Sequence, residues 1–267
     1  MDARRWLGLQ PTHNPMRWVL PVTPGISAAG QFLFGGCALG AAIAAMENVT
    51  ERPVVWATAQ YLSYATPPSM LDLDVTIAVA GNSITQARVV GHVADTEIVT
   101  VNAALGDRKL DEEGTWSVMP AVPSPEECQP RGLRSPGTES IMNRIDVRLA
   151  SARAWDDLDG DPMPEGRSVL WARVPDLLEL SSAASLAILG DYVPFGIGQA
   201  LGRVGGGNSL DNTLRVYRLV PTEWVLLDIR IQAVARGFGH GVVHQWAQDG
   251  ALLATASQST IVRLGMP

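Results

Sequence analysis

The residue types that carry many familiar catalytic motifs are scarce in this chain. Lys109 is the only lysine, and it stands in the charged stretch Arg108-Lys109-Leu110, so the chain has neither a Walker A loop nor a desolvated Schiff-base lysine. The sequence also lacks the Gly-x-Ser-x-Gly, His-Glu-x-x-His and Rossmann glycine patterns. Chemistry built on these motifs is therefore excluded.

The histidines and cysteines offer only weak alternatives. His240 and His244 would share one face of a strand, but no nearby Cys, Asp or Glu completes a metal site. We interpret both as structural or surface residues, and we expect no metal and no cofactor. Cys37 stands in an apolar segment and is interpreted as a small buried hydrophobe. Because Cys37 and Cys128 make no disulfide framework, a reducing, cytoplasmic setting is favoured.

The composition is typical of an acidic globular protein. Its 267 residues are enough for one large domain or two small ones, and 46% hydrophobic with 18% charged residues disfavours disorder. A net charge of −7 argues against a nucleic-acid binder. We expect no signal peptide, because no apolar run follows the first residues. The small-apolar run from Gly35 to Met46 is shorter than the ~20 residues that span a bilayer, so we also expect no membrane association.

A weak internal repeat connects two parts of the chain. Residues 57–106 align without a gap with residues 211–260, at an offset of 154. Asp74 falls on Asp228, and both segments share the order of strand, proline turn, long alternating strand, short turn, strand, acidic hairpin and last strand. The shared order predicts two copies of one structural unit.

Both copies predict an antiparallel meander of strands. Apolar and polar residues alternate from Leu71 to Ile77, which is the period of a half-buried strand, and Asp249-Gly250 favours a tight hairpin. Connections this short exclude parallel crossovers. The predicted strands are 54–64, 71–77, 83–93 and 98–105 in the first copy, and 141–149, 168–174, 213–219, 224–234, 239–247 and 252–264 in the second.

One buried helix is predicted ahead of each meander. The segment Gly36 to Met46 is apolar on every side, and Leu177 to Leu189 is rich in Leu, Ala, Ser and Ile. The expected fold class is α+β, with one helix wrapped by a long curved antiparallel sheet, twice over. We assign residues 1–114 to the N-terminal copy, 115–139 to a proline-rich exposed linker and 140–267 to the C-terminal copy.

Several short motifs, in a fixed order, carry a family resemblance. They are Phe34-Gly35-Gly36 at the start of the first helix, Gly81-Asn82-Ser83 in a turn, Asn208 to Thr213, Glu223-Trp224, and Ala251 to Gln258 in the last strand. Their order and spacing resemble the double hot-dog acyl-CoA thioesterases, the bacterial acyl-CoA thioesterase II family, over residues 30–106 and 140–264. The resemblance implies a double hot-dog fold, an acyl-CoA substrate, and self-association as a homodimer or larger homo-oligomer.

The resemblance also implies the site. The family uses an Asp, a Thr or Ser, and a Gln to position and polarise a water, and these correspond by position to Asp191, Ser209 and Gln258. The position of Ser209 is often Thr in the family, so the hydroxyl is kept while the methyl that fixes its rotamer is lost. Ala104 stands where the second copy has Gln258, so the first copy is expected to be catalytically empty.

Three glycines are candidates for substrate binding. Gly35 and Gly36 would let a substrate approach the backbone at the helix start, or would allow tight packing against the sheet. Gly207 belongs to the glycine-rich stretch from Gly205 to Asn208, which is either a mobile lip over the substrate or a simple connection.

The resulting hypothesis is hydrolysis of an acyl-CoA thioester to free acid and CoA. Asp191 would act as general base, Ser209 and Gln258 would hold the water, and a backbone N–H at a helix start would bind the oxyanion. Because Asp191 would follow a helix C-terminus, the dipole favours a raised pKa. The alternatives are a non-catalytic protein that binds acyl-CoA or an acyl chain and, more weakly, a scaffold without ligand.

Overall fold

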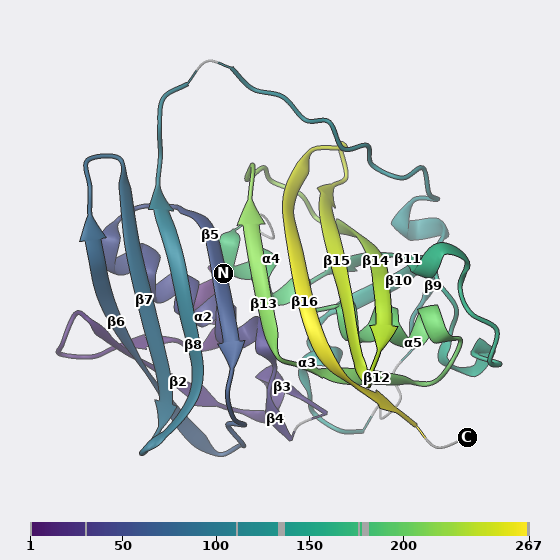
Figure 1. Ribbon diagram of the computed structural model, residues 1–267, viewed down its shortest axis with the longest axis horizontal. Helices are drawn as coiled ribbons and strands as arrows, with labels where there is room; N and C mark the ends of the chain where they lie inside the picture. The colour runs from purple at the N-terminus through teal and green to yellow at the C-terminus, as the bar shows by residue number, and fades with distance from the viewer. Residues whose placement is uncertain are drawn as a thin grey trace.

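The computed structural model describes most of the chain. The described residues are 2–29, 31–110, 112–132, 137–175, 177 and 182–265. Within them, fourteen strands make one antiparallel sheet, and two more pair separately (Figure 1).

The strands divide between the two parts of the chain. The first part contains β1 (Gln10–Pro11), β2 (Arg17–Val22), β3 (Ser27–Ala28), β4 (Phe32–Leu33), β5 (Val54–Tyr61), β6 (Ser69–Ala80), β7 (Ile84–Val93) and β8 (Thr96–Gly106). The second contains β9 (Gln129–Pro130), β10 (Asp146–Ser151), β11 (Arg167–Arg173), β12 (Gly205–Ser209), β13 (Asp211–Val216), β14 (Val225–Ala235), β15 (Phe238–Ala247) and β16 (Leu252–Leu264). The order across the sheet is β1-β2-β6-β7-β8-β5-β13-β16-β15-β14-β11-β10-β9, with β12 paired to β16.

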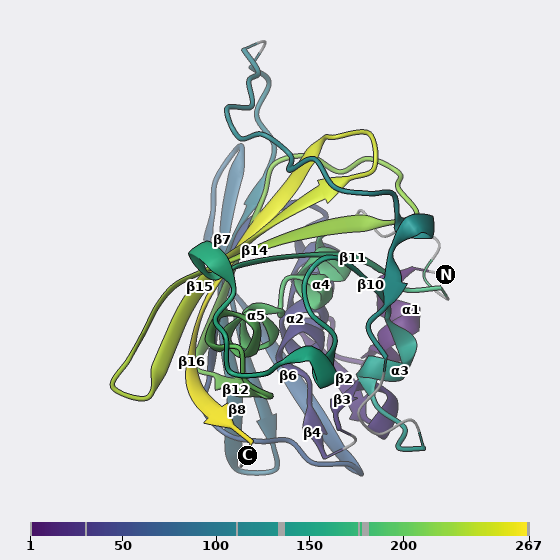
Figure 2. The ribbon, with the colours of Figure 1, turned by 90° about the vertical axis from the view of Figure 1, so that its right-hand side faces the viewer.

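The helices lie on one side of the curved sheet (Figure 2). They are α1 (Ala3–Leu7), α2 (Gly35–Thr50), α3 (Ile141–Arg144), α4 (Ala183–Leu189) and α5 (Val193–Leu201), with short 3₁₀ helices at Pro24–Ile26, Pro125–Glu127, Trp155–Asp157 and Pro164–Gly166. Helix α2 contacts β5 to β8, α5 contacts β14 to β16, and α4 packs between them against α2. Within the described part of the chain, no helix is both long enough and apolar enough to cross a membrane.

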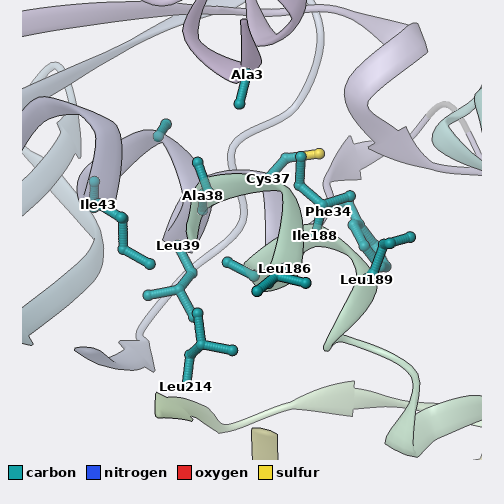
Figure 3. Packing of buried hydrophobic residues seen from close by; sticks show 14 of the residues in the cluster. Ala3, Phe34, Cys37, Ala38, Leu39, Ile43, Leu186, Ile188, Leu189 and Leu214 are labelled. Atoms are coloured by element: carbon teal, nitrogen blue, oxygen red, sulfur yellow. The ribbon is translucent and has the colours of Figure 1, made fainter. Parts of the chain in front are cut away.

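Helix α2 is buried because almost every residue of its central turns is apolar. Every residue from Gly36 to Met46 is buried, and the helix ends at Glu51, whose φ of 54° is left-handed. Figure 3 shows Leu39 of α2 beside Leu186 of α4 and Leu214 of β13. A Cβ on Gly36 would lie 2.8 Å from the carbonyl oxygen of Ala187, so this glycine lets α2 and α4 approach closely.

The predicted meanders are present, and they share their irregularities. Strands β6 and β7 shift register between Ile77 and Val79, and β14 and β15 shift between Ile231 and Ala233, each position 154 residues later. A second shift, in the pairings β7–β8 and β15–β16, recurs at the same offset. The central pair β5–β13 joins the two meanders into one sheet.

The region around the second helix differs from the prediction. The structure has two helices there, α4 and α5, where one was predicted over Leu177 to Leu189; residues 178–181 lie outside the described part. Gly190 ends α4, and Pro194 occupies the first turn of α5, where proline is favoured. Because α5 contacts the second meander as α2 contacts the first, α5 is the positional counterpart of α2.

Two local predictions near the site are also wrong. The segment 141–149 was predicted as a strand, but its first residues form helix α3, in which Ile141 is buried. Strand β10 begins only at Asp146. The glycine-rich stretch, predicted as a loop, is strand β12, whose five residues pair in register with β16 from Thr260 to Leu264. Glycine lacks strand propensity, so only the pairing partner determines this strand.

The segment between the meanders crosses one end of the sheet (Figure 1). It is only partly exposed, because Met119 and Val122 pack against a second apolar cluster of Cys128, Val169, Trp171, Trp224, Leu226 and Trp246. The indole N–H of Trp171 donates to the carbonyl of Pro123 at 2.9 Å. Residues 133–136 of the predicted linker lie outside the described part.

Candidate active site

The carboxylate of Asp191 lies at the break between two helices. Asp191 follows Gly190, which caps α4, and precedes Tyr192, which caps the start of α5. Its side chain is only 5% exposed, so its charge requires hydrogen bonds from the protein. One comes from far along the chain, because the backbone N–H of Gly36 donates to Oδ2 at 2.7 Å.

Ser209 and Gln258 donate to the other carboxylate oxygen. The Ser209 hydroxyl donates to Oδ1 at 3.2 Å, and the Gln258 amide nitrogen donates to the same atom. The same amide nitrogen also donates to the Ser209 hydroxyl at 3.1 Å. The three residues therefore form one closed hydrogen-bonded set.

The orientation of the Gln258 amide is fixed by the backbone of α5. Its carbonyl oxygen accepts the N–H of Val193 at 3.2 Å, which leaves the NH₂ group facing Asp191 and Ser209. This N–H belongs to the first residue of α5 and has no acceptor within the helix. Gln258 thus caps α5 and binds Asp191 at once.

Opposing effects act on the pKa of Asp191. Burial raises the pKa of Asp191, while the hydrogen bonds from Gln258, Gly36 and Ser209 act to lower it, and the net direction is upward. The dipole of the preceding helix, predicted to raise the pKa of Asp191, is only one of two helix dipoles at this residue. Asp191 follows the C-terminus of α4, but its Oδ2 also binds an N-terminal amide of α2, the positive end of that helix.

Strand β12 places Ser209 beside Gln258. Ser209 pairs with Thr260 of β16, two residues from Gln258 on the same face of that strand. A Cβ on Gly207 would lie 2.7 Å from the carbonyl oxygen of Ile261, so glycine allows the close approach of the two strands.

The two glycines at the start of α2 have different environments. A Cβ on Gly35 would lie 2.9 Å from Asp191 Oδ2 and 2.9 Å from Cζ of Tyr61, so glycine leaves room for both groups. The amide of Gly36 is committed to Asp191 and not free for a substrate. Both positions therefore favour glycine because of the site. Gly36 also allows α2 to pack closely against α4.

A cavity of about 260 Å³ opens next to Asp191. It is lined by Gly35, Gly207, Ser209 and Asp191, together with the rings of Phe32, Phe34, Tyr61, Tyr64, Trp155, Tyr192 and Phe195. A second cavity, of about 630 Å³, shares Phe32, Trp155, Gly207 and Arg131 with the first and extends to Arg263. The Asp191 carboxylate thus lies next to a cavity whose walls are largely aromatic.

The cavity residues that the sequence did not predict include Tyr61 and Arg131. The Tyr61 hydroxyl is buried near the side chain of Asn212, and it makes no hydrogen bond of ordinary geometry within the described residues. Tyr61 ends β5, and its N–H donates to the carbonyl of Leu210, the residue after Ser209. The strand pattern alone could not find it, because the pairing of β5 with β13 brings it there.

Cys37, His240 and His244, which were considered as a nucleophile or as metal ligands, do not line the cavity at Asp191. Cys37 is fully buried in α2, and burial raises the pKa of its thiol, so it is an unreactive core residue. His240 contacts the Ser259 hydroxyl at 3.1 Å, and His244 stacks on Trp246.

Comparisons with solved structures define the class of fold. The chain is similar to a protein with a hot-dog fold from Alicyclobacillus acidocaldarius (20% identity, TM-score 0.82, 96% of each chain covered). It is also similar to the acyl-CoA thioesterase II TesB2 of Mycobacterium marinum (19% identity, TM-score 0.77, 99% of each chain). The fold is therefore a hot-dog fold, in which a curved antiparallel sheet wraps a helix.

Sequence similarity identifies the family. The model of the acyl-CoA thioesterase C-terminal domain matches residues 125–262. A proposed thioesterase from Novosphingobium aromaticivorans is 34% identical, with a TM-score of 0.83, over 94% of this chain and 97% of that one. A search of curated proteins gives no significant match. The chain belongs to the acyl-CoA thioesterase family and is a thioester hydrolase.

Proposed function

We propose that the chain hydrolyses acyl-CoA thioesters with a water activated by Asp191, Ser209 and Gln258. The observation that carries this proposal is the convergence of Ser209 and Gln258, from separate segments, on the buried carboxylate of Asp191 beside an aromatic cavity. Perturbed, buried carboxylates in cavities are typical of catalytic bases.

The hydrogen-bond count leaves room for one water. A carboxylate has about four acceptor positions, and Asp191 uses three, so Oδ2 can accept one more hydrogen bond. The Ser209 hydroxyl donates to Asp191 and accepts from Gln258, which leaves it one further lone pair. A water that donates to both oxygens is held with its own lone pair free to attack.

The reaction then needs no covalent intermediate. The water oxygen attacks the thioester carbonyl carbon while Asp191 takes a proton from it. The tetrahedral intermediate breaks its carbon–sulfur bond, and the departing CoA sulfur takes the proton back from Asp191. The products are the free acid and CoA, and Asp191 returns to its charged form.

Two donors are available for the oxyanion of that intermediate. The N–H of Gly35 is the first of helix α2, where amides lack an acceptor within the helix, and Gly35 lines the cavity. The buried Tyr61 hydroxyl is the second. Burial and the charge of Asp191 raise the pKa of Tyr61, so it remains a proton donor.

We propose further that the chain is a double hot-dog of two repeats, with the boundaries 1–114 and 140–267. The register shifts that recur 154 residues apart support this division. We also propose a cytoplasmic homodimer or larger homo-oligomer; both cysteines are free, as in a reducing compartment. The sheet ends in two-residue strands that contain proline, so subunits would associate through a face, not an edge.

The test is release of free thiol from a panel of acyl-CoAs. Asp191→Asn and Gln258→Ala should each lower the turnover number by about 100-fold or more, because the first removes the base and the second removes the amide that orients Asp191 and Ser209. Arg88→Met, on the exposed face of β7, serves as a matched control and should keep full turnover. Circular dichroism checks that all variants are folded. Unchanged turnover in both site variants would contradict the mechanism, and acyl-CoA binding without thiol release would contradict the activity.

A further inference from the structure

We propose that Arg131 binds a negatively charged group of the thioester substrate, an inference that rests on the proposed function. Arg131 follows strand β9, outside the three catalytic candidates, and it lines both cavities. Its backbone N–H donates to Val147 of β10, which ties the residue to the sheet. Its position is therefore set by the fold.

The charge of Arg131 is buried, and no acidic residue among those that the structure describes pairs with it. The residue is 7% exposed, although arginine is rarely buried unless it is paired. Its guanidinium donates to the Tyr192 hydroxyl at 3.2 Å, to the carbonyl oxygen of Met142 at 3.4 Å and to the Met142 sulfur at 3.6 Å. All three acceptors are neutral, so the positive charge is not compensated by the described residues.

Positive charge outweighs negative charge among the described residues that line the two cavities around Arg131. Among the described residues that line them, the charged ones are Asp191, Arg131 and Arg263. The larger cavity thus has two arginines in its lining and no acid. An arriving anion would meet no repulsion there, while Asp191 already has Gly36, Ser209 and Gln258 as partners.

A buried guanidinium in this setting fits an oxyanion ligand. Its planar fork matches the two oxygens of a phosphate or a carboxylate, and such bonds strengthen away from water. An unpaired buried charge is costly to the fold, and a ligand that brings the counter-charge removes that cost. An acyl-CoA can supply it from the phosphates of CoA or from a carboxylate at the far end of the acyl group.

The experiment compares three thioesters on one set of variants. Butyryl-CoA has phosphates, S-butyryl-N-acetylcysteamine has none, and glutaryl-CoA adds a carboxylate to the acyl group. Arg131→Met removes the charge and keeps the unbranched stem, Arg131→Lys keeps the charge without the fork, and Arg88→Met is the control on an exposed arginine. The measurement is kcat/KM for each combination of variant and thioester.

We expect Arg131→Met to lower kcat/KM by roughly 10- to 100-fold for the substrate that carries the recognised anion, and Arg131→Lys to restore part of it. A loss for both CoA esters, with the N-acetylcysteamine ester unaffected, identifies the CoA phosphates. A loss confined to glutaryl-CoA identifies the acyl carboxylate. An equal loss on all three esters, or no loss on any, overturns the proposal.

Thermal stability gives a second readout that does not need turnover. Without ligand, Arg131→Met should melt at the same temperature as the parent or higher, because it removes an unpaired buried charge. A lower melting temperature would mean that Arg131 serves the fold and would overturn the proposal. If the parent hydrolyses these esters and Asp191→Asn does not, failure of the Arg131 test leaves the proposed function standing.

Discussion

The two meanders, β5–β8 with helix α2 and β13–β16 with helix α5, have the same framework and different chemistry. They share register shifts and an aspartate that binds an arginine, Asp74 with Arg17 and Asp228 with Arg167. At the position of Gln258, 154 residues earlier, the first meander has Ala104, and Leu33 stands two residues before α2 as Asp191 stands two before α5; both Ala104 and Leu33 are buried. The framework is thus independent of the site that it carries.

The first part of the chain nevertheless contributes to the site of the second. Gly36 donates its amide to Asp191, Gly35 leaves room for the carboxylate, and Tyr61 lines the same cavity with its buried hydroxyl next to Gly35. The first part contributes none of the three candidate side chains. It contributes backbone and hydroxyl groups instead. Three comparisons between the two parts test this division.

The largest effect is expected from protonation of Asp191, which has no titrating counterpart in the first part. Below the pKa of Asp191, kcat/KM should fall by about tenfold per pH unit, because the base must be unprotonated. Burial raises that pKa, so the midpoint should lie above the ordinary range of an aspartate. The measurement is the pH profile of thiol release from an acyl-CoA. Cys37→Ala should leave the profile unchanged, and a flat acidic limb in the parent enzyme would refute the role of Asp191.

The two shared ion pairs should differ in their contribution to stability. The Asp228 side chain is 1% exposed and accepts from Arg167 and Arg230, whereas Asp74 is 37% exposed. Asp228→Asn should therefore lower the free energy of unfolding by about 3 kcal/mol, and Asp74→Asn by less than about 1 kcal/mol. Urea titration at neutral pH measures both, and equal losses would contradict the distinction.

The pH dependence of that difference has a definite sign. Burial raises the pKa of Asp228, but the hydrogen bonds and the charges of Arg167 and Arg230 together outweigh it and lower the pKa, so the stabilisation is present above the pKa of the unfolded chain. It is lost as the pH falls through the lowered folded-state value. The gap between the parent and Asp228→Asn should therefore close in acid.

The smallest effect is expected for Tyr61→Phe, the hydroxyl from the first part. Removing one oxyanion donor while Gly35 remains should lower kcat by roughly tenfold or more and leave KM nearly unchanged. Tyr217→Phe is the control, because that exposed hydroxyl bonds Thr255 away from the cavity. Steady-state kinetics decide the question; a change in KM alone would assign Tyr61 to binding and remove it from the oxyanion site.

Much of the fold could be predicted because its patterns are local. Alternation placed the long strands from β6 to β8 and from β14 to β16, and an apolar run placed α2. Helix α5 and strand β12 were missed, because Gly and Pro obscure a helix that the sheet stabilises, and because β12 depends on its pairing with β16. Local propensity gives no signal for either.

The site divides in the same way. Asp191, Ser209 and Gln258 were predicted from a family resemblance, and the structure places them in mutual contact, while their catalytic roles stay a prediction. Tyr61 and Arg131 carry no motif in sequence. Tyr61 enters the cavity through the pairing β5–β13, which joins segments far apart in the chain, and Arg131 follows β9, which pairs with the nearby β10. Long-range pairing is the information that a local pattern lacks.

The hydrogen bond from Gly36 to Asp191 also constrains how this chain can evolve. Helix α2 supplies none of the three candidate side chains Asp191, Ser209 and Gln258, and on that ground alone its first residues would be free to accumulate substitutions. Here any larger residue at Gly35 would strike Asp191 and Tyr61, and any larger residue at Gly36 would strike α4. Selection on the chemistry of one unit is thereby transmitted to the other, and substitutions at these positions must be tolerated by both units together.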